Sequence, residues 1–475
     1  MNHSITPLYN RLINHIKKHP ISFHVPGHKQ GIIFTEPFSY FHDILNLDVT
    51  ELTGLDDLHC PEGVIKEAQD LLASLYKVNK SYFLVNGSTV GNLAMILAAI
   101  KENDEVLVQR NSHKSVLNGI ELAGGKPVFL DPEYNEQWAI SQGVSREMVQ
   151  HALDMFPNAK ALVLTYPNYY GQVNDLEGII KITHSKNIPV LVDEAHGAHF
   201  ITGGAYPKSA VQLGADIVVQ SAHKTLPAMT MGSFLHINSR YISVESIEKY
   251  LHILQSSSPS YPILASLDLA RSYAATYEDD DHEYLKKEIE TFKNKLHQLD
   301  QINVLESSEG DLLKLTIQTA NELSGFQMQS LFEEKGIYTE MADPANVLLV
   351  LPLLKRGMDF PFDKVVDTIA SSLNPYKIQR RTIIKSKYQP RVSTLVIHSN
   401  QFTQWKVKEV NLRQSIDGIA AEPVTPYPPG IPILMPGERI TETVVEQIEG
   451  LIETGARFQG NPRIYKRLIY IFEKQ

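Results

Sequence analysis

Short apolar runs alternate with helical stretches along the first half of the chain, and this alternation constrains the fold more than any other feature. The runs occupy residues 81–85, 105–108, 126–129, 161–165 and 189–193. Residues 64–76 and 90–100 have the apolar spacing of helices. Strands that alternate with helices predict a mostly parallel sheet covered by helices, so we expect an α/β fold.

The 475 residues are enough for two or three domains. A helical region over about residues 247–299 follows the alternating part, with a break expected at 256–259. The acidic cluster at 278–281 is interpreted as a solvated surface. We expect an N-terminal arm, a large domain, a small α+β domain and a C-terminal domain at residues 1–60, 61–300, 301–380 and 381–475.

Charge and cysteine content exclude several classes of protein. The net charge of -10 argues against nucleic acid binding, since such binders are usually basic. Cys60 is the one cysteine, so neither an intramolecular disulfide nor a cysteine metal cluster can form. The histidine spacings do not match a zinc site, and we expect no metal. No apolar run approaches the ~18 residues of a membrane span, and no signal peptide is recognised. We therefore expect a cytoplasmic protein.

Lys224 is the candidate catalytic residue because of its surroundings. It follows the apolar run at residues 215–219, and its neighbours Ala222, Leu226 and Pro227 are small or apolar. A lone lysine is nearly always a surface charge, and such neighbours are unusual for one. A primary amine can form an imine with an aldehyde, and desolvation makes a lysine amine more reactive. We therefore interpret Lys224 as a nucleophile.

Asp193 ends the apolar run at 189–193, which precedes the run that leads to Lys224. A buried carboxylate needs a cationic partner. An amine and a carboxylate on neighbouring strand ends suit pyridoxal phosphate, because the amine holds the aldehyde and the carboxylate keeps the ring nitrogen protonated. For an isolated aspartate, a helix cap or a salt bridge would be the better interpretation. The pair together predicts a pyridoxal phosphate site.

A phosphate site is predicted where the strand at 81–85 passes into a helix. Gly87 allows close approach of an anion, and Ser88 and Thr89 carry hydroxyl donors at the helix start. The alternative is a simple turn with an N-cap. Ser221 and His223, just before Lys224, are further candidate donors to the phosphate.

Two histidines are candidates for contact with the cofactor. His113 follows the strand at 105–108, where an imidazole could stack on the cofactor ring and serve as an acid or base. The alternative is a loop histidine with satisfied hydrogen bonds. His196 could contact the ring, the substrate or only the fold, and Glu194 is interpreted as structural.

These motifs together resemble the Orn/Lys/Arg decarboxylase family of fold-type I pyridoxal phosphate enzymes. The resemblance spans nearly the whole chain and implies a large domain with a mostly parallel sheet, followed by smaller C-terminal α+β domains. Asn168 and Cys60 depart from the residues usual at their positions. The motifs that carry the resemblance lie at residues 23–29, 54–59, 110–115, 193–197, 221–224, 426–432 and 435–438.

The resemblance also implies roles for individual residues. Lys224 matches the lysine that holds the cofactor, Asp193 the carboxylate on the pyridine nitrogen, and His113 the histidine stacked on the ring. Glu438 matches an acid near the distal amine or guanidinium of the substrate. Ser257 is expected to reach the phosphate from a neighbouring subunit, because family sites form in a homodimer or higher homo-oligomer. The phosphate positions are matched by Ser88, Thr89, Ser221 and His223.

The implied activity is α-decarboxylation of a basic amino acid, as in polyamine biosynthesis. Arginine is the first choice of substrate, followed by lysine or ornithine, and this order rests on analogy alone. Two alternatives stay open. One is another fold-type I activity such as an aminotransferase, and the other is a pyridoxal phosphate protein with a regulatory role and little turnover.

Overall fold

The computed structural model describes residues 1–475 except 35–37, 306–308, 379–390, 428–429 and 475. The described residues form two compact units. The first unit comprises Met1–Ala99 and Pro189–Glu278, and the second comprises Ile100–Ile188 and Asp279–Gln475. The predicted domain boundaries after residues 60, 300 and 380 follow a different division and stay predictions.

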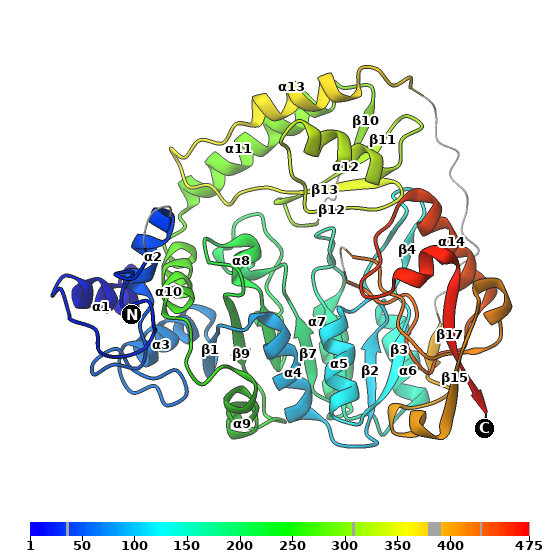
Figure 1. The fold of residues 1–475 in the computed structure, drawn as a ribbon, viewed down its shortest axis with the longest axis horizontal. Helices are drawn as coiled ribbons and strands as arrows, with labels where there is room; N and C mark the ends of the chain where they lie inside the picture. Colours follow the sequence, from blue (N-terminus) through cyan, green and yellow to red (C-terminus); the bar gives the residue numbers. More distant parts are fainter. Residues whose placement is uncertain (35–37, 306–308, 379–390, 428–429, 475) are drawn as a thin grey trace. The chain divides into compact units, whose positions relative to one another are not determined.

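The first unit has four strands of four or five residues, with helices packed against them (Figure 1). Its strands are β1 (Lys80–Leu84), β7 (Val190–Asp193), β8 (Ile217–Gln220) and β9 (Ser233–Ile237). Its helices are α1 (Pro7–Ile16), η1 (Phe38–Phe41), α2 (His42–Leu47), α3 (Val64–Tyr76), α4 (Gly87–Ala99), η2 (Ala198–Thr202), α8 (Ala222–Thr225), α9 (Val244–Leu254) and α10 (Tyr261–Ala275).

The pairing of these strands places the C-terminal ends of β7 and β8 side by side. The order is β1-β9-β8-β7, with β7 and β8 parallel and the other pairs antiparallel. All four residues of β7 and of β8 are buried, as their apolar sequences predict. Asp193 ends β7 and Gln220 ends β8. Because these two strands are parallel neighbours, both residues lie at the same end of the sheet.

The second unit contains the remaining strands and helices. The strands β6, β2 and β3 pair in parallel, and β14 pairs antiparallel with β3. These four strands are β2 (Glu105–Gln109), β3 (Lys126–Leu130), β6 (Ala161–Thr165) and β14 (Val392–Thr394). Three helices accompany them, α5 (Lys114–Leu122), α6 (Arg146–Met155) and α7 (Leu176–Ser185), together with the hairpin of β4 (Tyr134–Asn135) and β5 (Ile140–Ser141).

Two smaller sheets complete the second unit. An antiparallel sheet in the order β10-β11-β13-β12 packs with α12, and α11 and α13 contact each other beside it (Figure 1). Its elements are α11 (Asp279–Leu296), β10 (Ile302–Leu305), β11 (Lys314–Thr319), α12 (Gly325–Glu334), β12 (Met341–Ala342), β13 (Asn346–Val350) and α13 (Phe362–Leu373). A three-stranded sheet in the order β15-β17-β16 lies at the C-terminal end, with an apolar core of its own. Its elements are η3 (Ser399–Gln404), β15 (Trp405–Asn411), η4 (Leu412–Ser415), β16 (Ile419–Ala420), α14 (Glu442–Thr454), η5 (Pro462–Lys466) and β17 (Leu468–Lys474).

These elements confirm the α/β class with smaller C-terminal sheets. The helical region predicted over 247–299 is three helices, α9, α10 and α11, with the first break where the sequence predicts it. The prediction that residues 278–281 form a solvated acidic cluster was wrong for one residue. Asp281 is buried in the first turn of α11, and its Oδ1 accepts a hydrogen bond from the backbone N–H of Arg356 at 2.8 Å.

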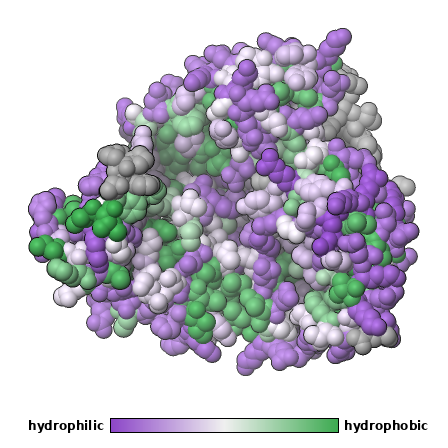
Figure 2. All heavy atoms as spheres, in the orientation of Figure 1, coloured by the Kyte–Doolittle hydropathy of each residue, from purple (hydrophilic) through white to green (hydrophobic). Residues whose placement is uncertain are grey.

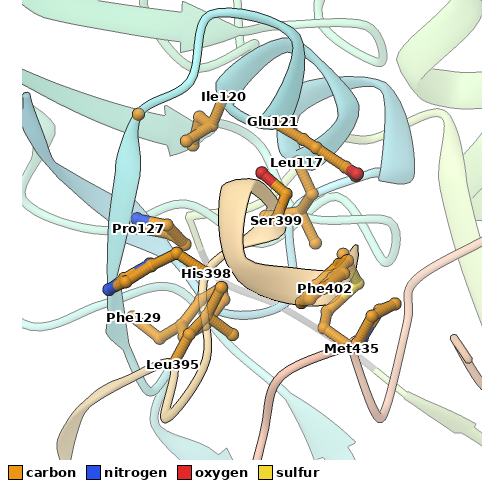
Figure 3. Close-up of a pocket in the computed structure, with 12 residues that line it drawn as sticks. Leu117, Ile120, Glu121, Pro127, Phe129, Leu395, His398, Ser399, Phe402 and Met435 are labelled. Atoms are coloured by element: carbon orange, nitrogen blue, oxygen red, sulfur yellow. The ribbon is translucent and has the colours of Figure 1, made fainter. Parts of the chain in front are cut away.

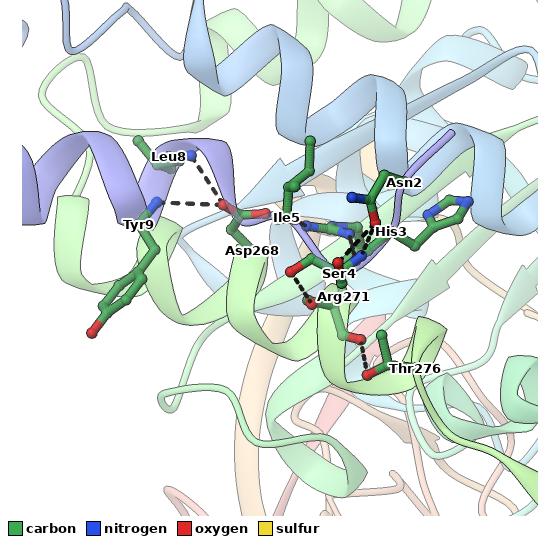
Figure 4. Close-up of polar contacts among 10 residues, drawn as sticks. Asn2, His3, Ser4, Ile5, Leu8, Tyr9, Asp268, Arg271 and Thr276 are labelled. Carbon is green, nitrogen blue, oxygen red and sulfur yellow. Dashed lines mark hydrogen bonds and ion pairs between the residues drawn. The ribbon is translucent and has the colours of Figure 1, made fainter.

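Helix α1 is anchored by a buried ion pair on α10 (Figure 4). Arg271 and Asp268 are fully buried and lie 2.7 Å apart, and Arg271 also donates to the carbonyls of His3 and Ile5. The other carboxylate oxygen of Asp268 accepts from the backbone N–H of Leu8 at 3.0 Å. Asp268 therefore caps α1 from a distant part of the sequence, because orphan N–H groups at a helix start need acceptors.

The described part of the chain has no helix of the length and apolar character that crossing a membrane requires.

Candidate active site

Lys224 lies on the short helix α8, directly after β8. Its amine nitrogen is 3.0 Å from Nε2 of His196, and both side chains belong to the first unit. Lysine has no acceptor, so Nε2 of His196 accepts and the neutral imidazole carries its proton on Nδ1. The pair brings together two predicted site residues and gives the lysine amine a base in hydrogen-bonding contact.

Asp193 is the last residue of β7 and is only 2% exposed. Its Oδ2 accepts from the side-chain amide of Asn92 at 2.9 Å, and its Oδ1 accepts from the backbone N–H of Ala195 at 3.2 Å. Sequence reasoning missed Asn92 as a site residue. Its spacing of four from Ser88 puts both on one face of α4, which was the available clue.

Two predicted phosphate residues come together at the start of α4. The hydroxyl oxygens of Ser88 and Ser221 are 2.7 Å apart. Gly87 begins the helix with φ +80°, a conformation that favours glycine, and a Cβ there would meet nothing within 4 Å. A 13-residue helix that begins at an open glycine beside two hydroxyls can bind an anion through its first N–H groups.

The remaining predicted phosphate residues lie in the same unit. His223 directs Nδ1 to the carbonyl of Gly232 at 3.0 Å, so Nδ1 carries a proton. Thr89 is exposed in the first turn of α4, and Ser257 is exposed in the loop after α9. That loop contacts the turn before α4, because the N–H of Ser256 donates to Oδ1 of Asn86 at 3.1 Å.

These groups fit pyridoxal phosphate. The cofactor needs an amine for its aldehyde, a carboxylate for its ring nitrogen and an anion site for its phosphate. Lys224, the buried Asp193 and the open start of α4 supply one group of each kind within the first unit. An amide donor on Asp193 leaves the carboxylate able to accept a further N–H from the ring.

Glu194 adds a buried network that the sequence did not indicate. Its carboxylate accepts from Ser209 Oγ at 2.7 Å, from the N–H of Ala210 at 2.6 Å and from Nε2 of Gln220 at 2.6 Å. Burial raises the pKa of Glu194 to about 8, and the three donors oppose this rise. The contact with Gln220 joins the residue after β7 to the last residue of β8, so it links the strand ends that lead to Asp193 and Lys224.

The side-chain oxygen of Gln220 also has hydrogen-bond partners. Its Oε1 accepts from the hydroxyl of Tyr76 at 2.7 Å and from Nε2 of His236 at 3.1 Å. The hydroxyl of Ser81 is 2.8 Å from Nδ1 of His236, and burial lowers the pKa of His236 to about 3. A neutral His236 thus donates to Gln220 and accepts from Ser81, which fixes the orientation of the Gln220 amide.

His113 and Glu438, the other two predicted residues, belong to the second unit. His113 is the N-cap of α5, and its Nδ1 accepts from the N–H of Ser115 at 3.2 Å. Glu438 is mostly buried and forms an ion pair with Arg110, whose Nη2 is 2.8 Å from Oε2. The roles predicted for His113 on the cofactor and for Glu438 on the substrate stay predictions.

Comparison with known proteins identifies the family. Residues 6–318 match the model of the Orn/Lys/Arg decarboxylase major domain, and residues 382–463 match the model of the C-terminal domain of the same family. The chain belongs to the Orn/Lys/Arg decarboxylase family. Within this family, the site of Lys224 and Asp193 falls in the major domain and Glu438 in the C-terminal domain.

Similar proteins cover the full length of this family member. An uncharacterized protein of Bacillus subtilis (strain 168) is 45% identical over 99% of both chains. An arginine decarboxylase of Halalkalibacterium halodurans is 34% identical over 96% of this chain and 95% of its own. The crystal structure of a Francisella novicida lysine decarboxylase has the same fold, with a TM-score of 0.80 at 22% identity over 99% of this chain and 81% of its own.

Proposed function

We propose that the protein catalyses pyridoxal phosphate-dependent α-decarboxylation of a basic amino acid, with arginine as the first choice of substrate. The observation that carries the proposal is the arrangement of the Lys224 amine, paired with His196, near the strand end of the buried Asp193. This arrangement lies in a member of a decarboxylase family. Lysine and ornithine are the next candidates.

Each residue has a task that follows from its contacts. His196 accepts a proton from the amine of Lys224, which leaves the nitrogen lone pair available to attack a carbonyl carbon. Asp193, held by Asn92, would accept the N–H of a protonated ring. Ser88, Ser221 and the first N–H groups of α4 bind the phosphate. We assign His113 to the ring by the family resemblance.

The cofactor, when bound, supplies the electron sink that makes loss of carbon dioxide from an amino acid possible. The protein would select the bond that breaks by holding the Cα–carboxylate bond of the substrate in one orientation. The substrate amine must also lose a proton to become nucleophilic, and the His196 imidazole would accept it after releasing to solvent the proton that it took from Lys224. Lys224 or His113 then returns a proton to Cα.

The choice of arginine is supported by the names of similar proteins. Relatives from Halalkalibacterium halodurans and Bacillus subtilis, 34% and 32% identical to this chain, are arginine decarboxylases. Relatives from Pseudomonas aeruginosa and Escherichia coli that are named lysine decarboxylase are 29% and 24% identical. The order of preference therefore stays arginine, lysine, ornithine.

We further infer that the protein works as a homodimer or a higher homo-oligomer. Apolar side chains gather on the N-terminal part of the first unit, at the left of Figure 2. Phe23 is 94% exposed and Ile32 is 78% exposed. Exposed apolar residues in such number are typical of a protein interface. The double variant Phe23→Asp, Ile32→Asp should lower the molecular mass of the particle measured by analytical sedimentation. The control Ile253→Asp, at another exposed apolar residue, should leave this mass unchanged.

Product analysis tests the function. Purified protein with pyridoxal phosphate receives arginine, lysine and ornithine separately, and mass spectrometry identifies the products, with Lys224→Ala as the control. We expect agmatine from arginine in excess over cadaverine or putrescine, and no amine from the variant. A keto acid would indicate an aminotransferase. A cofactor spectrum that shifts without product would indicate a binding protein with little turnover.

A further inference from the structure

Two motifs that are more than 300 residues apart in sequence form one structure in the second unit. Arg110 follows β2, and its guanidinium donates to three acceptors of the C-terminal domain. Nη1 donates to the carbonyl of Pro432 at 2.8 Å, and Nη2 donates to the carbonyl of Ile433 at 3.1 Å and to Glu438 at 2.8 Å. Arginine suits this task because its planar fork holds several acceptors at once.

Glu438 also stabilises the loop of residues 430–438 through its own contact with the loop backbone. Its Oε2, which accepts from Arg110, also accepts from the backbone N–H of Met435 at 2.7 Å. Gly437 has φ +88°, and a Cβ there would lie 2.0 Å from the carbonyl oxygen of Ile397, so only glycine fits. The acid and the glycine of this motif are thus explained by the conformation of the loop.

The side chain of Met435 faces a neighbouring hollow. It lines an apolar hollow together with Phe129 and Phe402 (Figure 3). The guanidinium carbon of Arg110 lies 4.9 Å from the centre of the Phe129 ring, within the range of a cation–π contact. Arg110 therefore packs on a ring that lines the same hollow as Met435.

The loop that is held in this way ends against His113. The carbonyl of Gly430 accepts from the N–H of Lys114 at 3.2 Å, and a Cβ at Gly430 would lie 3.4 Å from Nε2 of His113. Nδ1 of His113 accepts from the N–H of Ser115, so the neutral imidazole carries its proton on Nε2. The loop thus packs beside the protonated nitrogen of the predicted ring-stacking histidine.

We propose that Arg110 and Glu438 are positioning residues, which together hold residues 430–438 so that Gly430 packs against the imidazole of His113. The catalytic part of this inference rests on the proposed function. Glu438 was predicted to contact the distal cation of the substrate. In the structure, the carboxylate is already paired with a guanidinium, and a substrate cation would compete with Arg110 for it.

Hydrogen exchange on the apoprotein tests the positioning without relying on catalysis. We expect Arg110→Met and Glu438→Gln to raise the exchange rates of backbone amides in residues 110–118 and 430–438 by about 10-fold or more. Arg413→Met is the matched control, because Arg413 forms an ion pair with Glu449 elsewhere in the same unit. It should leave both segments unchanged. Unchanged exchange in the first two variants would overturn the proposal.

Steady-state kinetics then separate positioning from substrate contact. Loss of positioning should lower kcat by about 10-fold for arginine and lysine alike and change KM by less than about 3-fold. Gly430→Ala, which adds a methyl group beside His113, should reproduce this pattern. A large rise in KM for arginine with unchanged kcat in Glu438→Gln would instead make Glu438 a substrate ligand. If the unmodified protein forms no amine, the proposed function fails, and the exchange data still decide the positioning.

Discussion

The side-chain amide of Asn92 donates a hydrogen bond to the buried carboxylate of Asp193 at 2.9 Å. This contact joins the helix that begins at the predicted phosphate site to the strand end that carries the predicted ring partner. Under the proposed function, these two elements together would hold the phosphate and the ring nitrogen of one cofactor. Rigid elements of this kind hold a site in its productive geometry better than loops do.

Removal of the Asn92 amide should weaken cofactor binding. A hydrogen bond to a charged group is worth about 1.5–3 kcal/mol, so Asn92→Ala should raise the dissociation constant of pyridoxal phosphate about 10- to 100-fold. Fluorescence or absorbance titration of the apoprotein measures this. Asn118→Ala, at an exposed position of α5, serves as the control and should bind the cofactor normally. Equal affinity of the Asn92 variant would contradict the role of the contact.

His196 should control how quickly Lys224 captures the cofactor. Because Nε2 of His196 accepts a proton from the amine at 3.0 Å, His196→Ala removes the base in contact with the nucleophile. General base catalysis contributes about 100-fold or more, so we expect capture of added pyridoxal phosphate to slow by about that factor. Stopped-flow absorbance follows the capture, with exposed His151→Ala as the control. An unchanged rate would show that the contact is only structural.

Glu194 should make stability depend on pH. The pKa of Glu194 is raised by burial from its ordinary 4.5 to about 8. Between these values the folded protein keeps a proton that the unfolded chain has released. The protonated Glu194 therefore contributes to the free energy of unfolding below about pH 4.5. This contribution, up to about 5 kcal/mol, is lost as the pH rises to about 8.

Urea unfolding at pH 5, 6.5 and 8 tests the contribution of Glu194. We expect the midpoint of the unmodified protein to fall over this range and the fall to be smaller in Glu194→Gln, which cannot release the proton. Glu177→Gln, at an exposed position of α7, should show the same dependence of the urea midpoint on pH as the unmodified protein. The same slope in all three proteins would show that Glu194 does not titrate in this range.

The ion pair between Asp268 and Arg271 should be essential for attaching α1. Both side chains are fully buried, and removal of one partner from such a pair leaves an uncompensated charge at a cost of about 3–5 kcal/mol. Asp268→Asn should therefore lower the urea midpoint and expose residues 1–16 to proteolysis. The exposed pair of Lys295 and Asp363 offers the control, since Asp363→Asn should cost less than about 1 kcal/mol. Equal effects of the two variants would contradict this prediction.

The sequence predicts the elements best where an apolar pattern has clear limits. Helix α3 and strand β6 begin and end as predicted, because polar residues or turns bound their apolar faces. Helix α4 begins at Gly87, three residues before the predicted start at Val90. Its first turn consists of glycine, serine and threonine, whose side chains carry no apolar periodicity.

The sequence locates the candidate site residues most readily where they lie near strand ends. Lys224, Asp193 and Ser221 each follow or end an apolar run, and the run itself predicts where the residue lies. The contact of Arg110 with Glu438 has no such local sign, since 328 residues separate the partners. The Glu194 network is similar, because Gln220 and His236 appear in the sequence only as ordinary strand residues.

The most direct test of the central claim is release of carbon dioxide from arginine labelled at its carboxyl carbon. The protein, loaded with pyridoxal phosphate, receives the labelled arginine, and labelled carbon dioxide and agmatine are measured together. We predict equal amounts of the two products from the unmodified protein and neither from Lys224→Ala. Agmatine formation that persists in Lys224→Ala, or a keto acid that keeps the label, would contradict the account.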